Sequence, residues 1–102
     1  MNLTYPTMLV LEALSRGYHY GFDIMDATNL PSGTVYPILR RLDREGLASS
    51  RWESERVAQR EQRPARRYYE LDAAGEKMVA QAAERYRAIG AIAPRAVRQA
   101  RS

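Results

Sequence analysis

Between residues 30 and 46 the hydrophobic and polar positions follow the period of an α-helix. Four aliphatic side chains recur at intervals of three and four residues, which places them on one helical face: Val35, Ile38, Leu39 and Leu42. The other face is aromatic and cationic: Tyr36, Pro37, Arg40, Arg41 and Arg44. The pattern predicts an amphipathic helix that packs on a core with one face and presents positive charge with the other.

The ends of this helix are predicted from capping and from proline chemistry. Ser32, Gly33 and Thr34 are all suitable N-caps. Pro37 lacks an N–H group and fits best in the first turn, where donors have no helical partner. We therefore expect the helix to start near Thr34, with Pro37 close to the third helical position. Gly46 is expected to close the last turn in a left-handed conformation.

Two shorter helices are expected before it. Residue 5 precedes Pro6 and is expected to be extended, so Thr7 is the predicted cap of a first helix that ends near Arg16. A second helix should run from Phe22 to Ala27 or Thr28. The break at residues 29–33 then separates two helices by a tight turn, as in a helix-turn-helix.

After Gly46 the apolar period changes from 3.6 to 2. Strands are predicted over residues 47–55 and 66–71, joined by a long, polar, arginine-rich tip over residues 56–65. Three helices followed by a hairpin is the order of a winged helix, although an unrelated α+β domain would share it. The predicted fold class is α+β, mostly α: a winged helix-turn-helix of three helices with a two-stranded wing.

A last helix is predicted from Ala73 to about Ala93, capped by Asp72 and stopped by Pro94. Little chain follows it, so its apolar stripe must either fold back or meet another copy. We expect it to form a homodimer interface, with these residues: Met78, Val79, Ala82, Tyr86 and Ile89. Residues 1–71 are thus a predicted DNA-binding domain and residues 72–102 a dimerisation helix with a basic tail, in one compact unit.

Composition narrows the choice of partners. The chain of 102 residues is one domain by size, and it has no cysteine, which excludes disulfides and thiolate chemistry. No apolar run approaches the length that spans a membrane, and residues 1–15 do not form a signal peptide, so a cytoplasmic location without a membrane partner is expected. The net charge is +4, and nine arginines lie between residues 40 and 67 against five acids, which favours a polyanionic partner.

No catalytic or metal-binding constellation is visible. His19 is the only histidine and has no nucleophile near it in the sequence, and Asp23 and Asp26 are expected to face solvent or arginines. There is no phosphate-binding glycine loop and no metal-spaced cluster. We expect neither an enzyme nor a cofactor.

Several ordered motifs resemble the PadR family of bacterial transcriptional regulators. These are Tyr20-Gly21-Phe22-Asp23-Ile24, then Ser32-Gly33-Thr34-Val35-Tyr36-Pro37-Ile38-Leu39 with Arg41-Leu42 and Glu45-Gly46-Leu47, and Arg67-Tyr68-Tyr69-Glu70-Leu71 with Ala74-Gly75. The resemblance covers residues 8–90. It implies a dimeric winged-helix repressor whose last helix forms much of the interface, where some members bind drug-like or phenolic ligands.

This chain departs from the family pattern in two places. Its wing tip is long, rich in arginine and free of glycine, and its last helix has no tryptophan of the kind that stacks ligands in some members. The resemblance therefore implies a small aromatic effector less firmly than it implies DNA binding.

The functional hypothesis is a regulator that binds a palindromic operator in double-stranded DNA, because a dimer presents two recognition helices about one DNA turn apart. An effector bound at the dimer interface would change the distance between the two DNA-binding domains of the dimer, called the two heads below. The expected DNA contacts are Ser32, Thr34, Tyr36, Arg40, Arg41, Arg63, Arg66 and Arg67. The alternatives are a solvated basic face and a winged-helix module that binds protein, with an enzyme a distant third.

Overall fold

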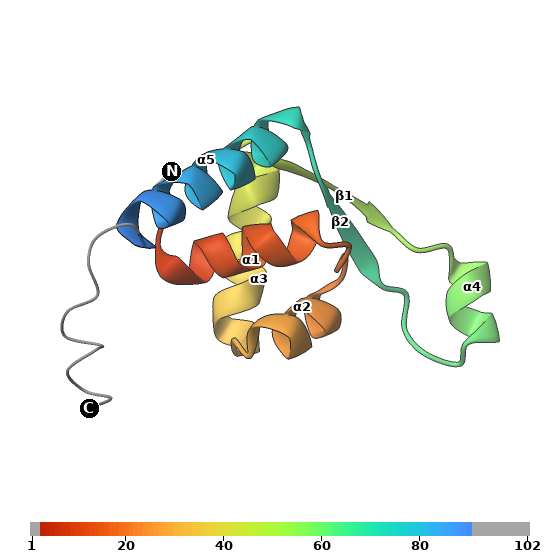
Figure 1. Cartoon of the computed structure of the whole chain (residues 1–102). Helices are drawn as coiled ribbons and strands as arrows, with labels where there is room; N and C mark the ends of the chain where they lie inside the picture. Colours follow the sequence, from red (N-terminus) through yellow and green to blue (C-terminus); the bar gives the residue numbers. More distant parts are fainter. Residues whose placement is uncertain (1–2, 91–102) are drawn as a thin grey trace, which may run out of the picture.

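The computed structural model describes residues 3–90, and for residues 86–90 it describes the backbone alone. Helices and strands follow one another in the order α1 (Tyr5–Ser15), α2 (Gly21–Thr28), α3 (Ser32–Arg44), β1 (Ala48–Trp52), α4 (Glu55–Arg60), β2 (Arg67–Leu71) and α5 (Ala73–Gly90). Helices α1, α2, α3 and α5 lie together, and the β1–β2 hairpin extends away from them with α4 at its far end (Figure 1). The predicted winged helix is confirmed.

The start of α1 differs from the prediction. Thr4, not Thr7, is the N-cap, and its hydroxyl accepts a hydrogen bond from the Thr7 N–H at 3.4 Å. Tyr5 is helical rather than extended, and Pro6 occupies the first turn, where its missing N–H costs no hydrogen bond. Thr7 is buried instead of capping the helix. Thr4 and Thr7 are both suitable N-caps, and they are three residues apart, so the sequence alone did not decide where α1 starts.

Helix α3 begins earlier than its proline suggested. Ser32 is its first residue and Pro31 its N-cap, so the predicted start near Thr34 is wrong and Pro37 is the sixth residue, inside the helix. The helix continues through Pro37 because Val35 and Leu39 on either side of it are fully buried, so tertiary packing outweighs one lost backbone bond.

The end of α3 agrees with the prediction. Gly46 has φ 75°, and the Leu47 N–H donates to the Leu42 carbonyl at 2.9 Å. This is the hydrogen bond of a Schellman motif, and both leucines are buried beside it. The motif turns the chain directly from α3 into the wing.

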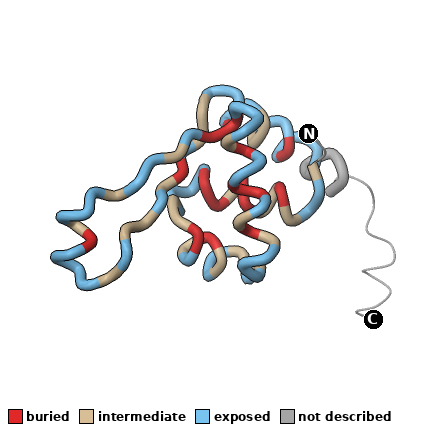
Figure 2. Tube along the Cα trace, turned by 180° about the vertical axis from the view of Figure 1, so that it is seen from behind, coloured by how far each residue is buried: buried red, intermediate tan, exposed pale blue. Residues whose placement is uncertain are grey.

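The core lies among α1, α2 and α3, and the wing is largely exposed (Figure 2). The fully buried aliphatic side chains of the core come from all three helices: Val10, Leu11, Ile24, Val35, Leu39 and Leu42. Burial of each such side chain stabilises the fold by about 1.5–3 kcal/mol. Tyr69 of β2 is also buried, which ties the base of the wing to the helices.

The wing is an antiparallel pair in which Ala48 lies opposite Leu71 and Trp52 opposite Arg67. Its strands are shorter than predicted, because residues 53–66 form a tip with its own helix. Helix α4 was not predicted from the sequence. Ser54 caps it by accepting a hydrogen bond from the Val57 N–H at 3.2 Å, and Gln62 ends it with φ 56°. A Ser cap followed by helix-forming residues was the signal for it.

Helix α5 returns along α1 (Figure 1). Ala82 is buried, and Met78 and Val79 pack against the core, so this part of the apolar stripe folds back on its own chain. The side chains of Tyr86 and Ile89 lie outside the described part of the structure, as do the predicted helix end near Ala93 and the basic tail. A groove remains between the two helices, with a volume of about 200 Å³.

Gly75 in the first turn of α5 is predicted to be needed for packing. A Cβ there would overlap the Leu47 backbone carbonyl oxygen and approach Leu71 Cδ2 to 2.9 Å. Gly75→Ala should lower the free energy of unfolding by about 1–3 kcal/mol, measured by chemical denaturation. The control is Gly33→Ala, which faces open space and should change stability by no more than about 1 kcal/mol. Equal stabilities of the two variants would contradict this packing.

Candidate nucleic-acid interface

Helix α3 holds its cationic face outward by burying the opposite face. Val35, Leu39 and Leu42 have no exposed surface. The exposed residues on the outer side include three arginines: Arg40, Arg41 and Arg44. Ser32 is exposed in the first turn and Thr34 is half-buried. Guanidinium groups carried on a rigid, exposed helix are suited to both phosphates and the base edges of the major groove.

Tyr36 is placed differently from the other predicted contact residues. It is half-buried, and its ring packs against the backbone at the start of α2, where Gly21 leaves room for it. A Cβ at Gly21 would lie 2.5 Å from the ring atom Cζ. The glycine of the Tyr20-Gly21 motif is therefore a packing partner of Tyr36, a role that sequence reasoning missed because the two residues are far apart in the chain.

A polar chain connects the wing to α3. Arg67 of β2 donates to the Ser50 hydroxyl at 2.8 Å, and that hydroxyl donates to Asp43 of α3 at 2.5 Å. The Arg67 guanidinium also lies 3.5 Å from the Asp43 carboxylate. These bonds fix the angle between the wing and α3, so Arg67 is engaged within the protein as well as exposed on its surface.

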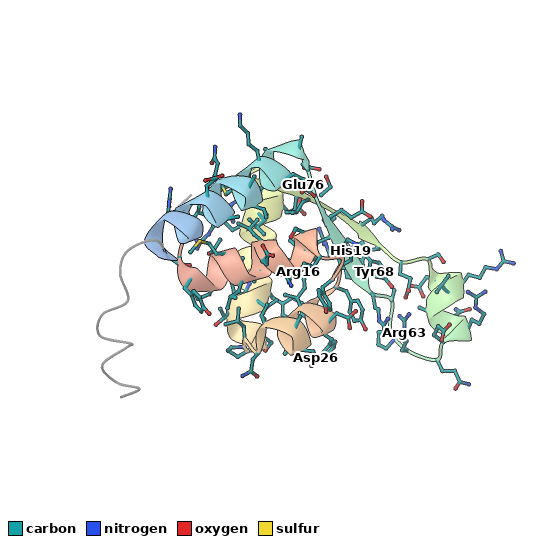
Figure 3. The ribbon with its side chains drawn as sticks, viewed as in Figure 1. Arg16, His19, Asp26, Arg63, Tyr68 and Glu76 are labelled. Atoms are coloured by element: carbon teal, nitrogen blue, oxygen red, sulfur yellow. The ribbon has the colours of Figure 1, made fainter. Side chains whose placement is uncertain are left out.

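A second joint connects the wing to the turn before α2. The Tyr69 N–H donates to the His19 carbonyl at 2.7 Å, and His19 Nδ1 lies 2.9 Å from the Tyr69 carbonyl oxygen. The rings of Tyr20 and Tyr68 meet edge to face at 5.9 Å. Figure 3 shows His19 and Tyr68 close together, where β2 passes the turn between α1 and α2. His19 is thus a turn residue, as predicted, with a structural hydrogen bond.

A partly buried ion pair organises the wing tip. Arg63 donates to both carboxylate oxygens of Glu53, at 2.5 and 2.9 Å, and Tyr68 donates to Glu53 at 3.0 Å. The Glu53 side chain is 7% exposed and that of Arg63 is 23% exposed. Hydrogen bonding from Arg63 lowers the pKa of Glu53 to about 2, and the same bond raises the pKa of Arg63. Figure 3 shows Arg63 at the α4 end of the hairpin.

The structure therefore divides the predicted contact residues into two groups. Ser32, Arg40 and Arg41 share the outer side of α3, and Thr34 lies partly buried in the same first turns. Arg66 and Arg67 lie where the tip joins β2, while the charge of Arg63 is matched by Glu53. Sequence analysis also missed Phe22 and Trp52, whose rings are exposed near this face.

Within the described part of the chain, no group of three or more His, Cys, Asp or Glu side chains could hold a metal ion. The described helices also include none with the length and hydropathy of a membrane span.

An exposed cationic helix braced by three others, with a two-stranded wing beside it, defines a winged-helix DNA-binding protein. Residues 10–81 match the family described as "Transcriptional regulator PadR-like family", so the chain belongs to this family. Its members are transcription regulators and not enzymes. A comparison with curated proteins finds no match.

Solved structures share the fold. A PadR-like transcription factor from Bacteroides fragilis is 27% identical, with a TM-score of 0.68 and 82% of each chain covered. A PadR family regulator from Clostridium difficile R20291 is 24% identical, with a TM-score of 0.74 over 85% of this chain and 92% of that one. BpsR of Bordetella bronchiseptica is 21% identical, with a TM-score of 0.70 over 90% of this chain and 69% of that one.

The tip ion pair predicts an acid-sensitive contribution to stability. Because folding lowers the pKa of Glu53 from 4.5 to about 2, the contribution is complete above about pH 5 and is lost as the pH falls toward 2. Wild type should be more stable than Glu53→Gln at pH 7, and the difference should shrink between pH 4.5 and 2, measured by denaturation followed at Trp52.

The matched control is Glu55→Gln, which removes an exposed carboxylate two residues away. At pH 7 this variant should lose much less stability than Glu53→Gln, because Glu55 is exposed and has no partner that matches Arg63. A stability difference between wild type and Glu53→Gln that is the same at neutral and acid pH would contradict the ion-pair account.

Proposed function

We propose that this protein is a homodimeric, sequence-specific transcriptional repressor that acts on DNA in the bacterial cytoplasm. The observation that carries the proposal is α3, whose buried aliphatic face turns Arg40 and Arg41 outward on a rigid support. We assign α3 to the major groove and the wing to the flanking backbone or minor groove.

The proposed contacts follow from residue chemistry. Arg40 and Arg41 can bind guanine edges or phosphates through paired N–H groups. Ser32 and Thr34 lie at the start of α3, where hydroxyls and free backbone N–H groups suit phosphate. Arg66 supplies the wing contact, while Arg63 and Arg67 hold the wing in position through Glu53 and Asp43.

A second copy of the chain is proposed to cover the groove between α1 and α5. The groove is mainly apolar and is lined by Tyr5, Met8, Val79, Ala82 and Ala83, among others. Tyr5 leaves 63% of its surface exposed there. We propose that Tyr86 and Ile89 extend the same interface, with residues 1–71 as the DNA-binding part and 72–102 as the dimerisation part. Two-fold symmetry then implies a palindromic operator.

We further propose that a small aromatic effector at this interface changes the spacing of the two heads. The B. bronchiseptica neighbour is described as a protein whose DNA binding is regulated by 6-hydroxynicotinic acid. An apolar groove shared by two copies would change shape when the distance between the two heads changes. A ligand that binds one of these shapes more tightly would then favour the corresponding spacing.

Selection of bound duplexes from a random pool tests the central proposal. An inverted repeat with half-sites about one helical turn apart is expected, since a dimer presents two α3 helices. Recovery of no preferred duplex at low salt would reject sequence-specific binding and favour a module that binds protein instead.

Arg40→Ala is predicted to weaken binding to the selected duplex by about tenfold, measured by fluorescence anisotropy. Relaxed preference at one base pair would identify Arg40 as a reader of bases, and an equal loss on all sequences would identify it as a phosphate contact. Lys77→Ala is the control, because Lys77 is an exposed cation on α5 that lies outside α3 and does not line the groove between α1 and α5. An equal loss of DNA affinity in the two variants would count against α3 as the DNA-binding surface.

Ala83→Glu is predicted to dissociate the dimer, because it places a charge in the groove between α1 and α5. Sedimentation at micromolar concentration should show a monomer, with weaker operator binding. Ala80→Glu is the matched control, since Ala80 is exposed on α5 and does not line the groove. A wild-type protein that sediments as a monomer would reject the dimer itself.

A further inference from the structure

The ion pair of Arg67 with Asp43 joins the wing to the cationic side of α3. Arg67 is the first residue of β2, and Asp43 lies in the last turn of α3, after Arg40. Arg67 Nη2 lies 2.8 Å from the Ser50 hydroxyl oxygen and 3.5 Å from Asp43 Oδ2. The Ser50 hydroxyl donates to the same Asp43 oxygen at 2.5 Å. A carboxylate therefore holds a wing arginine beside the surface that we assign to DNA.

Arg67 remains accessible to solvent although it is held. Its side chain is 43% exposed, and that of Asp43 is 34% exposed. Arg67 also borders a groove of about 360 Å³ between the wing, the start of α2 and Tyr36. Its guanidinium carbon lies 5.4 Å from the Trp52 ring and 5.9 Å from the Tyr69 ring. Since ion pairs this exposed are weak, a phosphate that approaches from solvent can take the place of the Asp43 carboxylate.

The position of Asp43 is unfavourable for the helix itself. A carboxylate in the last turn is repelled by the partial negative charge at the helix C-terminus. The basic residues of this turn, Arg41 and Arg44, suit both the helix dipole and DNA. Asp43 instead repels the phosphates that these arginines attract. Its contacts with Arg67 and Ser50 are the interactions that offset this placement.

The charges of the pair lie near that of Arg40. Burial raises the pKa of the Tyr69 hydroxyl, and the charges of Arg67, Asp43 and Arg40 all act on the same hydroxyl. The three charged side chains therefore surround one buried ring at the junction of α3 and the wing. A change in the charge of Asp43 alters the field around a predicted DNA contact.

We propose that Asp43 determines specificity by withholding Arg67 from the phosphates of non-specific DNA. Non-specific binding comes almost entirely from cations that neutralise phosphates, whereas base contacts add the preference for one sequence. On the operator, the intact pair keeps the wing at its angle to α3, so the bond has a use there that it lacks on other DNA. The inference rests on the proposed function, which assigns α3 and the wing to DNA.

Asp43→Asn tests the proposal, because it removes the charge while its amide oxygen can still accept the Ser50 hydroxyl. Fluorescence anisotropy gives the affinity for the selected duplex and for a duplex of the same composition in shuffled order. At low salt the variant should bind the shuffled duplex about threefold or more tightly than wild type does, as expected for one released cation. Its affinity for the selected duplex should rise by less, so the ratio of the two affinities should fall. Damage to the fold would instead weaken binding to both duplexes.

Salt dependence gives a second readout. The slope of log Kd against log salt concentration reports how many phosphates the protein neutralises. On the shuffled duplex, the slope of Asp43→Asn should be steeper than that of wild type by about one, the value for one additional phosphate contact. An unchanged slope would overturn the release of Arg67.

Glu70→Gln is the matched control. It makes the same change in net charge at another wing carboxylate, which lies 3.9 Å from Arg51 in an exposed pair. Glu70 lies opposite Ser49 in the hairpin, and thus on the other face from Ser50. This variant should change both affinities by less than about twofold and keep their ratio. An equal rise in non-specific affinity in both variants would overturn the proposal, because net charge alone would explain it.

A double variant separates the two ways in which Asp43 can act. In an Arg67→Gln background, Asp43→Asn should raise the affinity for the shuffled duplex no more than Glu70→Gln does. A full rise in that background would overturn the competition for Arg67, because Asp43 would then act on phosphates directly.

The role of Asp43 and the proposed function fail in different ways. If wild type prefers the selected duplex and Asp43→Asn keeps the same ratio of affinities, the role of Asp43 is overturned and the proposed function stands. If selection recovers no preferred duplex, and Asp43→Asn still gains affinity that depends on Arg67, the proposed function fails and the competition with phosphates stands. Binding of no duplex by either protein would overturn both.

Discussion

The constraint on which the structure depends is the burial of one face of α3. Val35, Leu39 and Leu42 are fully enclosed by α1 and α2, and this enclosure determines which side of the helix faces solvent. The helix could not turn Arg40 and Arg41 inward without burying unpaired guanidinium groups, which is strongly unfavourable. Packing of the core therefore also determines that the cationic face is exposed. The same packing holds α3 helical through Pro37.

The wing is attached with an additional kind of interaction. Ala48 and Tyr69 are buried and Leu71 packs against the core, and two polar joints are added to these contacts: the Arg67–Ser50–Asp43 chain and the His19–Tyr69 pair. Directional bonds hold an angle well, whereas an apolar contact would allow sliding. The wing can thus keep a set orientation toward α3 while leaving a groove between them.

Much of this was predictable because the relevant signals are local. Periodicity placed α3 and its two faces, and capping residues with alternation placed the hairpin and the start of α5. The errors have a common cause. Thr4 and Thr7 compete as caps, Pro37 suggested a later start, and the polar tip concealed a six-residue helix. In each case local preferences were nearly balanced, and tertiary packing or one cap decided the outcome.

The sequence by itself determined the order of the two strands and of every helix except α4, the two faces of α3 and the family, because these depend on residue spacing along one chain. Only the tertiary structure decided that Tyr36 packs against Gly21, that Arg63 pairs with Glu53, and that Phe22 and Trp52 line one groove. These pairings join residues from different elements, and no periodicity along the chain encodes them. They arise when the buried face of α3 and the polar joints of the wing bring distant segments together.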